Sequence, residues 1–240
     1  MNNLLALTIE AHGGFENWSR FDKISTRILF SESTWEHKQQ SGILQDMQVI
    51  INTRKQHTLL LPYYDKKIQV SIDPDRTAIE SRTSQTFEEL PKPRSSFEGH
   101  QRTSAWSFLQ AYYFAGYSMW NYFNQPFIFA DPAYHTIELE PWEENGEVWR
   151  RLMVIFPAEI ATHSTVQTFY IDSSGLVRRH DYNIEISGHL PAVHYLFDYT
   201  DSQGIKIPTK RKIYLKNQDN NSAYPESVLL DIQLDQIQLF

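Results

Sequence analysis

The sequence contains no cysteine, which excludes a disulfide framework, a thiolate zinc site, an iron–sulfur cluster and a cysteine nucleophile. It also lacks an excess of positive charge, since 22 basic and 29 acidic residues give a net charge of −7. Affinity for nucleic acid comes largely from basic residues that contact phosphates, so we expect no nucleic acid partner. No window contains the about 18–20 apolar residues of a membrane-spanning helix, so we expect no transmembrane segment.

The motifs of familiar catalytic and cofactor sites are missing as well. The sequence has no G-x-S-x-G, H-E-x-x-H, P-loop, G-x-G-x-x-G, S-x-x-K or EF-hand pattern. Its nine histidines are scattered singly rather than at the spacing of metal ligands. We therefore expect no cofactor and no metal.

The N-terminal segment does not have the features of a secretory signal, which needs a basic region followed by about 7–15 apolar residues. No lysine or arginine precedes Arg20, and the short apolar stretch at residues 4–7 is soon followed by Glu10. The sequence therefore predicts a cytoplasmic location.

What the sequence has in abundance is aromatic residues, with six Trp, thirteen Tyr and fourteen Phe. Because each aromatic side chain removes about 150–250 Å² from water when buried, the chain can form a large core. All-β proteins often reach 240 residues as one unit, and no linker divides this sequence. We therefore expect a single domain over residues 1–240.

Two segments have helical spacing of apolar residues, one at residues 3–11 and one at about residues 104–122. Thr103 or Ser104 is expected to cap the second helix, and Asn124, close before Pro126, to end it. This helix carries apolar or aromatic residues on almost every side, which is typical of a helix surrounded by protein. Residues 83–102 are rich in Ser, Thr and Pro without periodicity, which predicts a long loop.

Elsewhere apolar and polar residues alternate with a period of two, which predicts antiparallel strands. The first of these strands is expected from Asp22, with Ile24, Thr26, Ile28 and Phe30 on one face, and the others at residues 43–51, 57–63, 67–73, 76–82, 134–142, 147–156, 165–172, 176–186, 192–200, 205–215 and 227–239. So many strands around one buried helix require the sheet to curl. The predicted fold class is predominantly antiparallel β (α+β): a strongly curved open half-barrel of roughly ten strands with an N-terminal helix and a central plug helix.

The turn at Asn145 and Gly146 is the strongest hairpin signal in the chain and predicts the strand register around it. A two-residue turn pairs Trp142 with Trp149 and, further along, Ile137 with Val154. The Trp pair then lies on the outer face. The residues expected to face inward in this hairpin are His135, Ile137, Leu139, Arg150, Leu152, Val154 and Phe156.

Matching of apolar faces predicts the inward side chains of the later strands. They include Arg178, His180 and Tyr182 on one strand, Val193, Tyr195, Phe197 and Tyr199 on the next, and Arg211 on the strand after that. Buried charges are costly unless paired. Either each arginine pairs with an inward acid or lies at an open rim, or these cations line a basic and aromatic cavity for an amphipathic or acidic ligand.

The sequence resembles the LolA/LppX-like superfamily, the lipoprotein-carrier fold of bacteria. The resemblance rests on the N-terminal helix with Ala11, His12, Gly13 and Gly14, on Trp18 before the first strand, and on two strand meanders separated by a helix. It implies an open, strongly curved half-barrel that holds hydrophobic ligands. A cofactor-free enzyme of violacein biosynthesis also has this kind of fold, so the resemblance leaves carrier and enzyme open.

Three functions remain as hypotheses. The first is a binding protein for a hydrophobic or amphipathic small molecule, with Tyr113, Tyr117 and Trp120 as a stacking surface and Arg178 or Arg211 for an acidic end. The further candidate ligand contacts are Arg150, Tyr182 and Tyr195. The second is a cofactor-independent enzyme of specialised metabolism in which His180 or His135 moves a proton. The third is an interaction module that uses the outer Trp pair, for example to form a homodimer.

Overall fold

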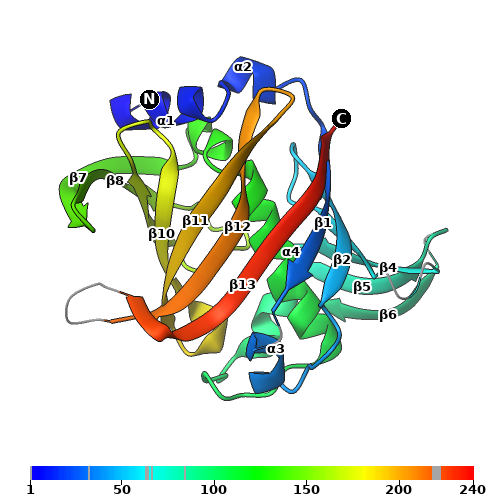
Figure 1. Ribbon diagram of the computed structural model, residues 1–240. Coiled ribbons are helices and arrows are strands. Elements are labelled where there is room, and N and C mark those ends of the chain that lie inside the picture. Colours follow the sequence, from blue (N-terminus) through cyan, green and yellow to red (C-terminus); the bar gives the residue numbers. More distant parts are fainter. Residues whose placement is uncertain (1, 32, 63–64, 66, 84, 218–222) are drawn as a thin grey trace.

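One antiparallel sheet forms most of the protein (Figure 1). The computed structural model describes residues 2–31, 33–62, 65, 67–83, 85–217 and 223–240. Within these residues thirteen strands follow the order β6-β5-β4-β3-β2-β1-β13-β12-β11-β10-β9-β8-β7. Strands β6 and β7 are the two edges and do not pair, so the sheet is open. The predicted antiparallel β class is confirmed, and the strand number is thirteen rather than about ten.

The strands form two meanders, one from each half of the chain. The first comprises β1 (Lys23–Phe30), β2 (Asp46–Asn52), β3 (Thr58–Pro62), β4 (Ile68–Asp73), β5 (Arg76–Ser81) and β6 (Thr86–Pro91). The second comprises β7 (His135–Glu144), β8 (Glu147–Ile155), β9 (Val166–Ile171), β10 (Val177–Ile184), β11 (Leu190–Ser202), β12 (Ile205–Lys216) and β13 (Ala223–Leu239). Pairing of β1 with β13 joins them, with Ile24 opposite Leu239 and Phe30 opposite Ile232.

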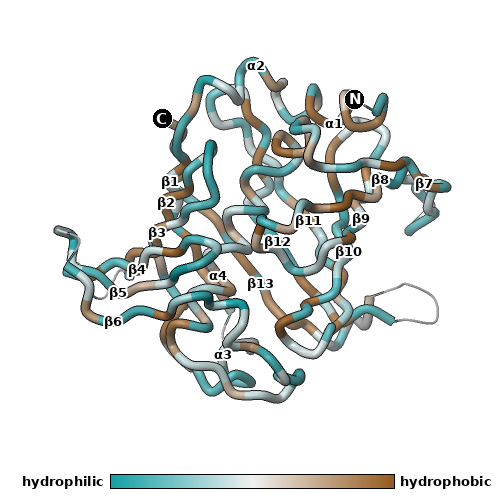
Figure 2. The backbone as a smooth tube through the Cα atoms, turned by 180° about the vertical axis from the view of Figure 1, so that it is seen from behind, coloured by the Kyte–Doolittle hydropathy of each residue, from teal (hydrophilic) through white to brown (hydrophobic). Residues whose placement is uncertain are grey.

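Short helices connect these strands, and one long helix is buried. The described helices are α1 (Asn3–Ala11), α2 (Phe15–Trp18), α3 (Ser33–His37), α4 (Phe108–Asn124) and the 3₁₀ turns η1 (Pro93–Phe97), η2 (Phe127–Ala130) and η3 (Glu185–Ser187). Seen from behind, α4 lies between β3–β6 on one side and β10–β12 on the other (Figure 2). Helix α4 packs most closely on β2–β6.

Helix α4 begins later than the sequence predicts, because Ser107 rather than Thr103 or Ser104 caps it. Ser107 and Gln110 form a capping box, in which each side chain accepts from the other residue's backbone N–H. Every residue from Leu109 to Asn124 is buried, as the all-round apolar pattern indicates. Asn121 Nδ2 donates to the carbonyl of Ala161 at 2.8 Å, whereas the Oδ1 atoms of Asn121 and Asn124 are buried without a hydrogen bond to the described residues.

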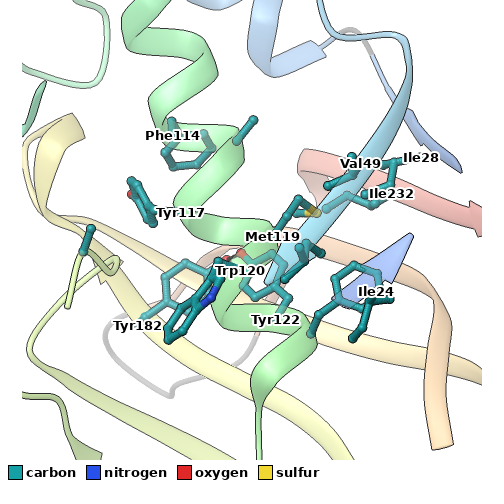
Figure 3. Packing of buried hydrophobic residues seen from close by; sticks show 14 of the residues in the cluster. Ile24, Ile28, Val49, Phe114, Tyr117, Met119, Trp120, Tyr122, Tyr182 and Ile232 are labelled. Atoms are coloured by element: carbon teal, nitrogen blue, oxygen red, sulfur yellow. Dashed lines mark hydrogen bonds between the residues drawn. The ribbon is translucent and has the colours of Figure 1, made fainter. Parts of the chain in front are cut away.

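The core lies between α4 and the sheet. Figure 3 shows Ile28, Val49 and Ile232 of β1, β2 and β13 together with aromatic side chains of α4. At Gly116 the helix approaches β4 so closely that a Cβ atom there would lie 2.8 Å from the Ile72 side chain. The carbonyl of Gly116 accepts a hydrogen bond from Thr58 Oγ1 at 3.1 Å. A glycine is therefore required at this position by the contact with the sheet.

The expected loop at residues 83–102 is partly wrong, because residues 86–91 form the edge strand β6. This strand pairs with β5, with Ala78 opposite Glu89. Its residues are exposed on both faces, except for the half-buried Leu90. With neither face of the strand in the core, no apolar alternation marks it in the sequence.

The predicted register of the β7–β8 hairpin is confirmed near the turn and wrong beyond it. Trp142 pairs with Trp149, but a register shift between Leu139 and Trp142 places Ile137 opposite Met153 instead of Val154. Because one extra residue moves every later side chain to the other face, His135 and Ile137 point outward. Ile137 is 48% exposed.

The inward faces predicted for β10 and β11 do not match each other in the structure. His180 lies opposite His194 and Arg179 opposite Tyr195, so Tyr195 faces outward and His194 inward. The prediction assumed a solvated outer face. In fact Arg179 is fully buried on that face, where it pairs with Asp181 at 2.7 Å and lies over the Tyr170 ring. Both faces of β11 are buried there, so polarity does not distinguish them.

Candidate functional site

A cluster of aromatic and basic side chains is buried between α4 and the inner face of β10–β12. We call it the His–Tyr cluster. It consists of Tyr117 and Tyr122 of α4, His163 before β9, His180 and Tyr182 of β10, His194 of β11 and Arg211 of β12. Figure 3 shows Tyr117, Tyr122 and Tyr182 in this region. All seven side chains are buried.

His163 connects two tyrosines of α4. Its Nδ1 lies 3.2 Å from the Tyr117 hydroxyl and its Nε2 lies 2.8 Å from the Tyr122 hydroxyl, which in turn lies 2.8 Å from the Tyr182 hydroxyl. The His163 ring stacks on Tyr182 with centroids 4.1 Å apart. Burial, with a smaller effect of Arg94, lowers the pKa of His163 to about 3, so the ring is neutral near pH 7. Four polar side chains thus form one continuous hydrogen-bonded chain.

His180 is held as a donor. Gln167 donates from Nε2 to Thr162 Oγ1 and to the Ser164 carbonyl, so its Oε1 is left to accept from His180 Nε2 at 2.6 Å. The His180 ring also stacks on Phe169 with centroids 4.1 Å apart. Burial holds the pKa of His180 well below its usual value. His180 is therefore a neutral imidazole protonated on Nε2.

Neither ring nitrogen of His194 has a hydrogen-bond partner among the described residues, although the side chain is completely buried. Its ring meets Tyr122 edge to face, with centroids 4.6 Å apart. Burial, and then the positive charge of Arg211, lower the pKa of His194 far below its usual value. This imidazole is neutral, and it keeps a buried N–H without an acceptor.

Arg211 is the buried cation of the cluster, with only 2% of its surface exposed. Its Nη2 donates to the carbonyl of Tyr122 at 3.1 Å, and its guanidinium lies 5.1 Å from the centroid of the Tyr122 ring. Its Nε has no partner. No carboxylate is among the groups that act on its pKa, which burial lowers. In the described part of the chain, Arg211 is a buried charge without a counter-ion.

We call the cavity beside the cluster on the α3 side, of about 380 Å³, the main cavity, because it borders the cluster; the larger hollow near α2, described below, does not. Its apolar and aromatic walls are Trp106, Phe114, Tyr122, Tyr182, Ile184, Leu190, Ile213 and Leu230. His37, Lys38, Arg102 and Glu226 add charged or titratable groups to the lining. Such a volume lies within the range of small-molecule sites, about 300–1,000 Å³.

Lys38 is the buried cation of the main cavity, with 5% of its surface exposed. Its ammonium donates to the Arg102 carbonyl and to Ser187 Oγ, each at 2.8 Å, and lies over the Trp106 ring. No described carboxylate lies within ion-pair distance of it. Burial, and then the charge of Arg102, lower the pKa of Lys38 to about 8, so that it is mostly charged at pH 7.

The small cavity, of about 30 Å³, lies on the α1 side of the cluster. Tyr122, His180 and Arg211 line it, together with His12 and Gln125. Burial lowers the pKa of His12 to about 4, and its Nδ1 lies 2.7 Å from the Thr8 carbonyl. Since Tyr122 borders both cavities, the cluster separates them.

The predicted stacking residues are all buried on α4, but they do not lie together on one cavity. Trp120 lines a third hollow of about 520 Å³ near α2, and its Nε1 donates to the carbonyls of Asn52 and Lys55. Tyr117 belongs to the hydrogen-bonded chain with His163. Tyr113 is buried beside Arg94 and lines none of these three cavities. Among the predicted aromatic contacts, Tyr182 lines the main cavity.

The predicted cations differ in their surroundings. Arg150 shares the face of Leu152 but is 44% exposed and pairs with Glu138 at 2.8 Å. Arg178 pairs with Asp172 at 2.6 Å and is partly exposed. These two fit the expectation of paired or rim positions, whereas Arg211 is buried and unpaired.

The expected inward positions of His135 and Tyr195 are wrong. His135 is exposed, and the Tyr195 hydroxyl donates to Glu144 on the outer face. Half-buried Trp142 lies over Arg179 there, while Trp149 is buried. The acid–base roles of His180 and His135 stay predictions. His180 borders the small cavity, and His135 lies away from both cavities.

Several residues of the site were missed by sequence reasoning. Lys38 lies in a polar stretch without periodicity, and its contacts with Arg102 and Ser187 join segments 64 and 149 positions away. His163 lies in a loop, and His194 alternates with Val193 and Tyr195, which the sequence predicts to face inward. An isolated histidine carries no local signal of burial, so the sequence could not find these positions.

Neither a metal-binding group nor a membrane-spanning helix occurs in the described part of the chain. Although three histidines lie close together, no three or more His, Asp or Glu side chains there are placed to hold a metal ion. No described helix is both long and apolar enough to cross a bilayer.

Comparisons with known proteins concern the fold. No family model matches the sequence, and no curated protein matches it. A LolA superfamily protein from Nitrosomonas europaea has a similar structure, with 9% identity and a TM-score of 0.55, covering 97% of this chain and 92% of its own. A putative outer membrane lipoprotein-sorting protein domain from Vibrio parahaemolyticus is 10% identical, with a TM-score of 0.49 and coverage of 95% and 93%. The first match confirms the predicted LolA-like fold.

Proposed function

We propose that the protein binds an amphipathic small molecule with an acidic end in the main cavity. The observation that carries the proposal is Lys38, a buried ammonium on the cavity wall without a carboxylate partner. A buried cation is costly unless an anion offsets it. A ligand carboxylate or sulfonate at Lys38 supplies that anion.

The rest of the cavity suits the apolar part of such a ligand. Phe114, Ile213 and Leu230 form apolar wall, and the Tyr122 and Tyr182 side chains add aromatic surface. Burial of apolar ligand surface is favourable by about 25 cal/mol per Å² before the costs of association. The resemblance to a superfamily whose members carry hydrophobic ligands agrees with this proposal. The acidic end is thereby assigned to Lys38 instead of Arg178 or Arg211.

The test is a fluorescence titration with anilinonaphthalene sulfonate, an amphipathic anion that fluoresces in apolar surroundings. Lys38→Met is expected to weaken binding about tenfold or more, because a charge-assisted contact contributes about 1.5–3 kcal/mol. Lys206→Met is the matched control, since Lys206 pairs with Asp201 and lies outside the main cavity. Equal affinity for the wild type and both variants would refute the assignment of Lys38.

A second variant tests the position of the apolar part. Ile213→Trp fills the wall of the main cavity and is expected to exclude the probe while the chain still folds. Circular dichroism checks folding. Native mass spectrometry of the purified protein then identifies any co-purified molecule, which is expected to be acidic and to be lost from Ile213→Trp. A retained molecule of the same mass would place the ligand elsewhere.

A further inference from the structure

The small cavity has an unusual electrostatic lining. Arg211 borders it, as do His12 and Lys206, and no Asp or Glu is among the described residues that line it. Lys206 pairs with Asp201 at 2.9 Å and is partly exposed, so it contributes at the rim. The Arg211 side chain is buried in the protein interior. The cavity is therefore bordered by a buried positive charge, and the carboxylate that acts on its lining residues His12 and Tyr199, Asp172, is not part of the lining and pairs with Arg178.

Two buried donors of this cavity have no acceptor. Arg211 Nε and Gln125 Nε2 are both inaccessible to solvent, and neither makes a hydrogen bond. They come from different elements, β12 and the residue that follows α4. Leaving a buried donor unsatisfied costs about 1–3 kcal/mol, and more for a charged group. Both residues line the small cavity, which makes it the place where an acceptor would satisfy these donors.

The contacts that Arg211 does make offset only part of its charge. One of its five N–H groups reaches the Tyr122 carbonyl in the last turn of α4, where the helix dipole favours a cation. The Tyr122 ring lies beside the guanidinium. Both are dipolar or quadrupolar partners, and neither neutralises a full positive charge in a buried site.

We propose that the small cavity is an internal site for a small monovalent anion, such as chloride, bromide or formate, bound by Arg211 and Gln125. The volume of about 30 Å³ sets the size of the ion. One water-sized particle needs at least about 10–15 Å³ by this measure, so two or three heavy atoms fill the space. The site is independent of the main cavity, because Lys38 does not border it.

The test is thermal unfolding at constant ionic strength, with sodium chloride replacing sodium gluconate, whose anion is too large for the cavity. An anion that binds the folded state raises the melting temperature, by about 5–10 °C at 100 times its dissociation constant for a protein of this size. Arg211→Met is expected to abolish this shift, and Gln125→Leu to reduce it. Arg150→Met, which removes an exposed arginine, is the matched control and should keep it.

A chloride shift of equal size in the wild type and in Arg211→Met would be a general salt effect and would overturn the proposal. Crystals grown in sodium bromide give a second readout that needs no variant. An anomalous peak beside Arg211 Nε and Gln125 Nε2 is expected. If the cavity holds only water at molar bromide, the proposal is overturned. This readout uses the wild-type protein, so it stands even if Arg211→Met does not fold.

Discussion

The ammonium of Lys38 lies 4.4 Å from the centroid of the Trp106 indole ring. The ring lies against the ammonium at the wall of the main cavity, and Ser187 Oγ accepts a hydrogen bond from Lys38 Nζ at 2.8 Å. Indole is the preferred aromatic partner of a cation, and the attraction is strongest where water is excluded. The indole ring and the Ser187 hydroxyl thereby fix the position of the ammonium.

The low pKa of Lys38 makes ligand binding depend on pH. Burial lowers this pKa from 10.5 to about 8, so above pH 8 the amine of the free protein is mostly neutral. Binding of an anion must then take up a proton. We expect the affinity for anilinonaphthalene sulfonate to be constant between pH 6 and 7.5 and to fall up to about tenfold per pH unit above pH 8. Titrations from pH 6 to 10 measure this, and Lys38→Met should show a flat profile; the same decline in that variant would exclude Lys38 as its cause.

Replacing His194 by an apolar ring is expected to stabilise the protein. Both ring nitrogens of His194 are buried without partners, whereas its edge-to-face contact with Tyr122 needs only an aromatic ring. His194→Phe should raise the free energy of unfolding by about 1 kcal/mol, measured by urea denaturation. His180→Phe is the control and should lower it, because it removes the bond to Gln167. A loss of stability in His194→Phe would indicate that its nitrogens bind something in solution.

Stability should fall as the pH drops below 6.5, because four buried histidines resist protonation. Burial lowers the pKa of His12 to about 4 and that of His163 to about 3. It also holds the pKa values of His180 and His194 well below the usual value of a histidine. Below pH 6.5 the unfolded chain binds protons that the folded chain does not. Each histidine then removes up to about 1.4 kcal/mol per pH unit, until the pH reaches its folded pKa.

Urea midpoints measured from pH 4 to 8 test this expectation. His194→Phe should have a shallower slope than the wild type by about one proton between pH 6 and 5. Midpoints that do not change between pH 7 and 5 would mean that the histidines are not buried as neutral rings.

Adding one methyl group at Gly116 is expected to destabilise the protein. Alanine is favoured over glycine in a helix by about 1 kcal/mol, but here its Cβ would overlap with Ile72. We expect Gly116→Ala to lower the free energy of unfolding by about 1–3 kcal/mol. The double variant Gly116→Ala/Ile72→Ala should lose less than the sum of the single variants, because two of the three crowded atoms are gone. Strict additivity in chemical denaturation would argue against this contact.

The sequence predicted the secondary structure better than the faces of the strands. The Asn145–Gly146 turn correctly paired Trp142 with Trp149, since a two-residue turn determines the pairs next to it. Because of the register shift between Leu139 and Trp142, the His135 side chain faces outward instead of inward. Nothing local marks such a shift, apart from Pro141, which cannot donate to the strand ladder.

The sequence correctly predicts that Tyr182 faces inward, but its prediction that Tyr195 faces inward is wrong. The error has a physical cause, because the Arg179–Asp181 pair makes the outer face of β10 and β11 as buried as the inner one. Hydrophobic matching distinguishes two faces only where one of them meets water. For the same reason His194 was assigned to solvent although its side chain is completely buried.

By itself the sequence determined the antiparallel strands and the buried helix, because strand and helix periods are properties of neighbouring residues. Only the tertiary structure decided which cations have partners. Arg178 meets Asp172, whereas Arg211 and Lys38 meet no described carboxylate. Whether a buried charge is paired depends on which side chains folding brings together. No local sequence pattern records which of them meet.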